Sequence, residues 1–407
     1  MPFREHSVVD EREEFVRLAM VPGANLSELC RRFGIARSNG YKWLRRYKQE
    51  GRAGLHDQSR RPHHSPTHTC EKIEGEVLRV RMESKDAWGA RKIARVMRRE
   101  FRDVPALSTI TEILRRHGKL AASRQEHPGR FRRFERPQPN DLWQMDFKGH
   151  FALPRGRCHP LTVLDDHSRY AVGLQACGNE QDMTVRERLI TLFRCYGMPF
   201  EMLMDNGPPW GDGVNQRYTR LTVWLLRLGI RTTHGRPYHP QTQGKDERFH
   251  RTLNHELIKR TSFRDIGHCQ EEFDGWRHIY NHMRPHEALD LDTPATRYQV
   301  SPRAFPETLP EVEYWPGDAI RRVNNDGIFR YQKHPWRIGK AFAGQLVALR
   351  ADEAAGRHAV YFCSKRIAQI DTHDPNSCGL VDDARASPTT PQEHQQINSN
   401  TQHGSSR

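Results

Sequence analysis

Three carboxylates in the central part of the chain have the setting that metal-dependent chemistry on phosphates requires. Asp146 lies inside an apolar stretch typical of a strand, Asp205 follows the apolar run EMLM at a predicted strand end, and Glu247 lies at the start of a predicted helix. Such positions can converge at one edge of a sheet. Carboxylates gathered there repel one another unless a cation neutralises them, and their oxygens suit Mg²⁺ or Mn²⁺. Two such ions, about 3.5 to 4 Å apart, would hold the attacking and leaving oxygens of a phosphoryl displacement.

Each acid taken alone also has an ordinary explanation. Asp before Asn-Gly is common in turns, and Glu is common in the first turn of a helix. On that helix, Asp246 is a second candidate. A helical period of about 100° per residue groups Asp246 with the apolar Phe249 and puts Glu247 on the polar side. We therefore expect Glu247 to be the ligand and Asp246 to serve the helix N-terminus.

The adjacent acids Asp165 and Asp166 form a competing pair of metal ligands. Both lie in the run LDDHSRY, between two predicted strands. Asp side chains often accept hydrogen bonds from backbone N–H groups in such turns. We expect the pair to cap the turn, with Arg169 available as a partner.

Residues 1–57 predict a small domain of the helix-turn-helix kind. Between residues 25 and 51, apolar residues recur at helical spacing on both sides of Gly34, which supplies the turn. The second helix would bring some polar and basic side chains to base edges and others to phosphates. The predicted base-edge residues are Arg37, Ser38, Asn39 and Lys42, and the predicted phosphate residues are Arg45, Arg46 and Lys48. The alternative is a solvated basic face on a protein-binding bundle.

Residues 68–120 predict a second helix-turn-helix domain, so that two consecutive domains would cover a longer DNA site than one. Residues 121–139 are rich in Lys and Arg and poor in core-forming residues. This composition is typical of a basic linker that lies along a phosphate backbone. Within the linker we expect DNA contacts from Arg130, Arg132 and Arg133.

The rest of the chain predicts two further domains and a tail. In residues 140–300, strand-type apolar stretches are followed by helical ones, which indicates an α/β domain. Residues 311–372 contain several short strand-like runs and predict a small, SH3-like β-barrel. Residues 376–407 have few large apolar side chains and are predicted to be disordered. The expected fold class is therefore multidomain, with helical N-terminal units, an α/β core and a C-terminal β-barrel.

The charge of the chain favours a polyanionic partner. Lys and Arg total 65 against 50 for Asp and Glu, a formal net charge of +15, and nucleic acid is the first partner to test. No stretch approaches the roughly 20 apolar residues that span a bilayer, so we expect a cytoplasmic protein with no membrane partner.

The eight cysteines include no C-x-x-C pair, which argues against a disulfide framework. His63, His64, His68 and Cys70 could gather a zinc ion, but the second ligand pair of a closed structural site is missing nearby.

Four stretches carry a resemblance to a known family. They are WQMDFKG from 143, LTVLDDHSRYAVG from 161, LMDNG from 203 and GRPYHPQTQGKDERFHRTL from 235. Over nearly its whole length the chain resembles the integrase-core transposases of bacterial insertion sequences, a branch of the superfamily that includes retroviral integrases. The resemblance implies a ribonuclease-H-like fold for residues 140–300. It also implies an Asp-Asp-Glu active site, whose members map onto Asp146, Asp205 and Glu247.

The resemblance further implies a DNA transposase. Its helix-turn-helix units would bind the terminal inverted repeats of an element, and its core, with two Mg²⁺ or Mn²⁺ ions per active site, would cleave each end and join it to target DNA. Two ends imply a dimer or a larger synaptic complex, in a bacterial cytoplasm and associated with the nucleoid. The alternative is a catalytically silent DNA-binding regulator derived from a transposase. A structure-specific nuclease of the same fold would leave the helix-turn-helix units and the barrel unexplained.

The sequence departs from the family pattern on the helix that carries Glu247. Many relatives place Lys or Arg seven residues after the catalytic Glu, where this chain has Asn254. We expect Arg251 to take over that DNA contact, with Lys245 and Arg248 beside it on the same helix.

Overall fold

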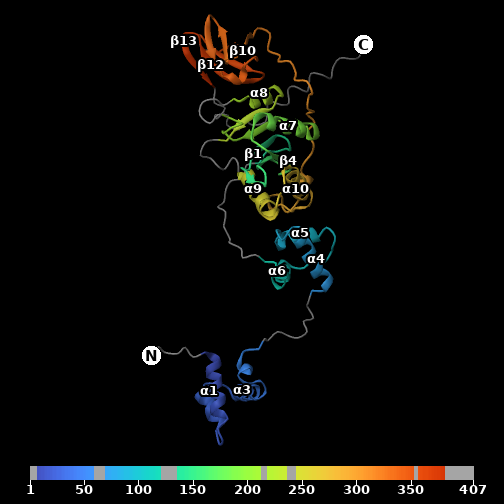
Figure 1. The fold of residues 1–407 in the computed structure, drawn as a ribbon, viewed down its shortest axis with the longest axis vertical. Coiled ribbons are helices and arrows are strands. Elements are labelled where there is room, and N and C mark those ends of the chain that lie inside the picture. The colour runs from blue at the N-terminus through green and yellow to red at the C-terminus, as the bar shows by residue number, and fades with distance from the viewer. Residues whose placement is uncertain are drawn as a thin grey trace, which may run out of the picture. The chain divides into compact units, whose positions relative to one another are not determined.

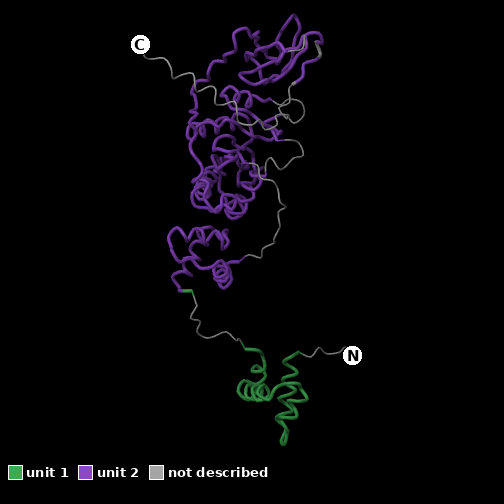
Figure 2. Tube along the Cα trace, turned by 180° about the vertical axis from the view of Figure 1, so that it is seen from behind, with its two compact units in different colours: residues 1–69 green, residues 70–407 purple. Residues whose placement is uncertain are grey.

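The computed structural model describes residues 7–58, 69–120, 135–211, 218–235, 244–352 and 356–380. The chain forms two compact units, residues 1–69 and residues 70–407 (Figure 2). None of the helices in the described ranges is long and apolar enough to cross a membrane.

Residues 7–58, the described part of the first unit apart from Thr69, form three helices and a final 3₁₀ turn. They are α1 (Val8–Ala19), α2 (Leu26–Arg32), α3 (Arg37–Glu50) and η1 (Gly51–Leu55). Side-chain oxygens of Ser7 and Asn25 accept backbone N–H groups at the starts of α1 and α2, as N-caps do. Gly40 lets α3 approach α2 closely, because a Cβ there would lie 2.6 Å from Sγ of Cys30. The two helices predicted on either side of Gly34 are therefore present and tightly packed.

The second unit begins with three more helices, α4 (Glu71–Glu83), α5 (Ala90–Met97) and α6 (Leu107–Arg116). Their shared core includes Val77, Ile93 and Ile110, all fully buried. Residues 121–134, most of the predicted basic linker, lie outside the described residues.

A six-stranded mixed sheet follows. Its strands are β1 (Leu142–Phe147), β2 (Phe151–Ala152), β3 (Arg157–Asp165), β4 (Ala171–Cys177), β5 (Glu201–Met204) and β6 (Arg231–His234). The strands β1, β3 and β4 pair antiparallel, whereas β1, β5 and β6 pair parallel. The central strand β1 thus has an antiparallel neighbour on one side and a parallel neighbour on the other.

Helices cover both faces of this sheet (Figure 1). One core joins Trp143 and Met145 of β1 to α7 (Asp182–Tyr196) and α8 (Arg220–Arg227). The other core joins β3 and β4 to α9 (Gly244–Glu256) and α10 (Ile266–His278). Side chains alternate between the faces of a strand, so Gln144 and Asp146 face the side opposite Trp143 and Met145.

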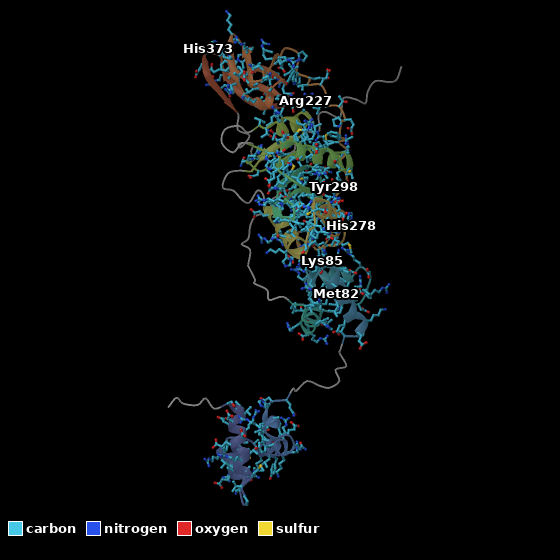
Figure 3. All side chains as sticks on the ribbon, in the orientation of Figure 1. Met82, Lys85, Arg227, His278, Tyr298 and His373 are labelled. Atoms are coloured by element: carbon cyan, nitrogen blue, oxygen red, sulfur yellow. The ribbon has the colours of Figure 1, made fainter. Side chains whose placement is uncertain are left out.

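Short helical turns complete this domain. They are the 3₁₀ turns η3 (Ile258–Arg260), η5 (Glu287–Leu289) and η6 (Pro294–Thr296) and the π-helical turn η4 (Ile279–Met283). Tyr298, labelled in Figure 3, stacks on Tyr170 with the ring centroids 4.1 Å apart. This contact fastens the end of the domain to the start of β4.

The C-terminal part is a five-stranded antiparallel sheet with a separate hairpin. The sheet order is β13-β12-β11-β10-β7, and the hairpin is β8-β9. The strands are β7 (Ala319–Arg322), β8 (Ile328–Tyr331), β9 (His334–Arg337), β10 (Leu346–Ala351), β11 (Arg357–Phe362), β12 (Lys365–Asp371) and β13 (Asp374–Leu380), with the 3₁₀ turn η7 (Lys340–Phe342). No hydrogen-bonded pairing closes the described strands into a ring. The predicted barrel is therefore not confirmed.

The predicted disorder from residue 376 is wrong at its start. Residues 376–380 belong to β13, where Gly379 and Leu380 pair with Gln369 and Ala368 of β12. These residues form a strand because β12 supplies backbone hydrogen-bond partners. Their own side chains include few large apolar ones, so the sequence of the segment alone does not predict a strand. Residues 381–407 lie outside the described residues.

Candidate active site

The register of the sheet brings Asp146 and Asp205 together. Gln144 of β1 pairs with Leu203 of the parallel strand β5, and each Asp lies two residues further along its own chain. Asp146 is half-buried in the last part of β1, and Asp205 is exposed immediately after β5. The two carboxylates therefore lie at matched positions on neighbouring strands.

The electrostatics of Asp146 reflect this placement. Burial raises its pKa to about 7, and the negative charges of Asp205 and Glu180 act in the same direction, while a backbone hydrogen bond from Phe147 opposes them. A carboxylate that is costly to ionise beside a second acid suits a site where a bound cation neutralises both. The donor set, with oxygen atoms only, fits Mg²⁺ or Mn²⁺.

Hydrogen bonds between side chains and backbone hold the loop after β5 in place. The carbonyl oxygen of Asp205 lies 2.9 Å from Nδ1 of His234, and the side-chain Nδ2 of Asn206 donates to the carbonyl oxygen of Gly235 at 2.7 Å. Both partners lie at the end of β6. The position of Asp205 is thus fixed by the neighbouring parallel strand.

The two acids of α9 differ sharply in exposure. Glu247 is exposed, whereas Asp246 is 2% exposed and shares the buried face of α9 with Phe249 and Leu253. The helical period therefore assigned the two sides correctly. Burial raises the pKa of Asp246 well above its usual range, and the charges of Asp146 and Asp166 add to the effect. Its Oδ1 has no hydrogen-bond partner in the described part of the chain.

Glu247 is not drawn into a cluster with the two Asp residues. Within the described ranges, no three His, Cys, Asp or Glu side chains lie close enough to hold a metal ion. Residues 236–243, which lead into α9, lie outside those ranges. The structure thus places Asp146 and Asp205 at matched positions where the charge of one affects the other, and the participation of Glu247 stays a prediction.

The competing pair Asp165 and Asp166 is occupied by structural contacts. Asp165 is fully buried and accepts the backbone N–H of Ser168 at 2.8 Å and of Asn140 at 2.7 Å. Asp165 therefore caps the turn, as expected. Arg169 instead pairs with Glu135, at 2.7 Å.

Asp166, also fully buried, binds two other elements. Its Oδ1 accepts a hydrogen bond from Nε2 of Gln144 at 2.7 Å and forms a close ion pair with Nζ of Lys245. The side chain of Lys245 is only 18% exposed, so this residue faces the protein core rather than the surface expected for a DNA contact. Arg248 and Arg251 are exposed, with Nη2 of Arg248 lying 3.7 Å from Glu287, and Asn254 is half-buried.

The outward face of α3 presents most of the residues predicted to contact DNA. Arg37, Ser38, Asn39 and Arg45 are exposed. Lys42 and Arg46 are half-buried and lie over the ring of Trp43, at 4.6 Å and 5.3 Å from its centroid. Such cation–π contacts leave their charges partly directed at the protein itself.

Sequence reasoning missed Tyr41 on this face. Its side chain is 64% exposed, although a large aromatic residue is normally at least partly covered. The spacing of four residues from Arg37 and from Arg45 was the signal, since residues so spaced share one side of a helix. Six other predicted residues fall outside the described residues: Arg130, Arg132 and Arg133 of the linker, and the histidines near Cys70, namely His63, His64 and His68.

Comparison with known families identifies the parts of the chain. Residues 136–240 and 228–294 match the family described as Integrase core domain. Residues 11–63 match a Helix-turn-helix domain, residues 39–114 match a Homeodomain-like domain, and residues 318–377 match the IS481 family transposase, C-terminal domain. The chain thus combines N-terminal helix-turn-helix domains with an integrase core and the C-terminal domain of an insertion-sequence transposase, which confirms the resemblance.

The chain is also similar in sequence to proteins of bacterial insertion elements. The chain is 27% identical over 178 residues to the insertion element IS407 uncharacterized 31.7 kDa protein of Burkholderia multivorans, covering 42% of this chain and 62% of the relative. It is 24% identical over 208 residues to a putative transposase for insertion sequence element IS5376 of Geobacillus stearothermophilus, covering 50% of each. The chain thus spans only about half to three fifths of these relatives.

Two solved structures are also similar. The integrase catalytic core domain of HTLV-2, in complex with magnesium, is 14% identical with a TM-score of 0.31, over 40% of this chain and 99% of that chain. A simian T-cell lymphotropic virus intasome, in complex with PP2A regulatory subunit B56 gamma, is 18% identical with a TM-score of 0.35, over 70% of this chain and 91% of that chain.

Proposed function

We propose that the chain is a DNA transposase that binds the terminal inverted repeats of an insertion sequence, cleaves the element ends and joins them to target DNA. The observation that carries the proposal is the matched position of Asp146, in the last part of β1, and Asp205, immediately after the adjacent parallel strand β5, in a chain that matches integrase core and helix-turn-helix domains. The similarity to a putative transposase of an insertion sequence element supports the same activity.

In this proposal Asp146, Asp205 and Glu247 hold two Mg²⁺ or Mn²⁺ ions. When bound, such ions lower the pKa of water or a hydroxyl and stabilise the leaving oxygen, so no separate general base is needed. The protein positions the acids, two of them on a buried sheet whose strands fix their separation. No side chain is expected to form a covalent intermediate with DNA.

DNA recognition is assigned to several basic surfaces. The exposed residues of α3 would read the repeat, and Arg248 and Arg251 of α9 would contact DNA beside the active site. The linker arginines Arg130, Arg132 and Arg133 would follow the phosphate backbone. We propose domain limits of 1–57, 68–120, 121–139 and 140–300, followed by a C-terminal domain that was predicted as residues 311–372 and that also takes in β13, which ends at Leu380. We propose an SH3-like barrel for this last domain. Joining two ends requires a dimer or a larger assembly.

Substitution of the acids tests the proposal. Asp146→Asn, Asp205→Asn and Glu247→Gln should each reduce cleavage of a labelled end substrate in Mg²⁺ by more than about 100-fold, because each removes a charge used in the transition state. Binding of the end DNA should remain. Asp246→Asn is the matched control, since it alters the adjacent buried acid.

Two outcomes would count against the proposal. A fully active Glu247→Gln protein would remove Glu247 from the site. Wild-type protein that binds end DNA without cleaving it in any divalent metal would favour the DNA-binding regulator instead.

A further inference from the structure

The side chain of Thr162 joins the strand that carries Asp146 to the helix that carries Glu247. Thr162 is the cross-strand partner of Asp146 in the β1–β3 ladder and is fully buried. Its hydroxyl donates to the backbone carbonyl oxygen of Asp146 at 2.9 Å and lies 2.8 Å from Nε2 of His250. The hydroxyl has a single hydrogen, which Asp146 receives, so the imidazole must donate its Nε2 hydrogen to Thr162.

His250 is suited to this contact in its neutral form. Burial, with a smaller contribution from Lys148, lowers the pKa of its ring to about 4. A neutral imidazole carries one hydrogen, and the contact with Thr162 holds it on Nε2. The bond is therefore present throughout the neutral range.

A second contact fastens the other side of Glu247. Lys245, two residues before Glu247, pairs with the buried Asp166, and Asp166 also accepts Nε2 of Gln144 at 2.7 Å. Gln144 lies two residues before Asp146 on β1. The helix α9 is thus bonded to the region of β1 both before and after Glu247.

These bonds supply what apolar packing lacks. Phe249 and Leu253 press α9 onto the sheet, but apolar contact is non-directional and permits a helix to slide or turn. Hydrogen bonds weaken steeply with misalignment and so fix a position. A small rotation of α9 would move the exposed side chain of Glu247 away from Asp146.

We propose that Thr162 and His250 are positioning residues, which set where Glu247 stands relative to Asp146. The inference rests on the proposed function for its catalytic consequence, but the mechanical link can be measured separately.

Hydrogen–deuterium exchange of the full chain tests the link. Thr162→Val and His250→Leu should speed amide exchange in α9 by about tenfold, the equivalent of one lost hydrogen bond. Thr162→Ser and His250→Gln retain the hydroxyl and a nitrogen donor and should exchange like the wild type. The control is Thr252→Val on the same helix, where the lost hydroxyl donates, within the described residues, to the carbonyl oxygen of Arg248 alone.

Cleavage kinetics test the positioning role. Thr162→Val should lower kcat by about tenfold or more with KM for end DNA unchanged, and Thr162→Ser should restore it. In the double variant with His250→Leu the loss should equal that of one substitution, because both remove the same link. Unchanged exchange, unchanged kcat, or a Thr162→Ser protein as impaired as Thr162→Val would each overturn the proposal. If the wild type cleaves no DNA, the proposed function fails, while the exchange measurement still decides the link.

Discussion

Acid destabilisation of the integrase core is expected to depend on His250. The pKa of its ring is lowered from 6.5 to about 4 in the folded protein, whereas the unfolded chain keeps the ordinary value. Between these two pH values the unfolded state binds a proton that the folded state does not. The free energy of unfolding therefore falls as the pH falls through this window, and the effect is complete below it. The shift corresponds to about 3 kcal/mol in full and about 2 kcal/mol at pH 5.

The His250→Gln variant isolates this effect, because it keeps a nitrogen donor for Thr162 and does not titrate. Urea unfolding of the wild type and the variant would be compared at pH 7 and pH 5 by tryptophan fluorescence, to which Trp143, fully buried in the core, contributes. The wild type should lose about 2 kcal/mol more than the variant between these pH values. Contributions from other titrating groups cancel in the difference. Equal losses in both proteins would refute a buried, neutral His250.

Three further predictions follow from the same structure. Asp246→Asn should raise the thermal midpoint more at pH 8 than at pH 5, because burial raises the pKa of Asp246 and its ionisation costs more folding free energy as the pH rises; calorimetry with the opposite order would contradict this. Tyr41→Ala should reduce the preference for end DNA over random duplex by about tenfold, whereas Arg45→Ala should weaken both equally in competition gel shifts. Asn254→Lys should recover part of the strand transfer lost in Arg251→Ala, and strictly additive effects on joining rates would exclude compensation between them.

The parts of the site that the sequence predicted are those fixed by short-range pattern. Asp146 was predicted inside an apolar strand-type run and Asp205 directly after another, and the register of the parallel strands β1 and β5 puts the two at matched positions. The separation of Asp246 from Glu247 followed from the helical period alone. The turn role of Asp165 followed from local backbone chemistry.

The parts that were missed depend on residues distant in the chain. Lys245 faces inward because Asp166 lies buried beside α9. The helical pattern around Lys245 does not predict a partner so distant in the sequence. Residues 376–380 form a strand because β12 offers them an edge. The closure of the C-terminal sheet depends on pairings between its ends, which strand-type runs do not specify.

The length of the outward face of α3 limits how many base pairs the first unit can contact. Arg37 and Arg45 are eight residues apart, which spans about 12 Å at the rise of an α-helix, or about three to four base pairs of duplex. A given sequence of four base pairs occurs by chance about once in 250 base pairs, which is far too often to identify the ends of one element in a genome. The first unit alone would therefore have too little sequence specificity to identify the element ends. Recognition of a DNA sequence long enough to be unique would therefore need further contacts. These would come from the helices α4 to α6 in addition to α3, or from two copies of the chain bound to the two element ends.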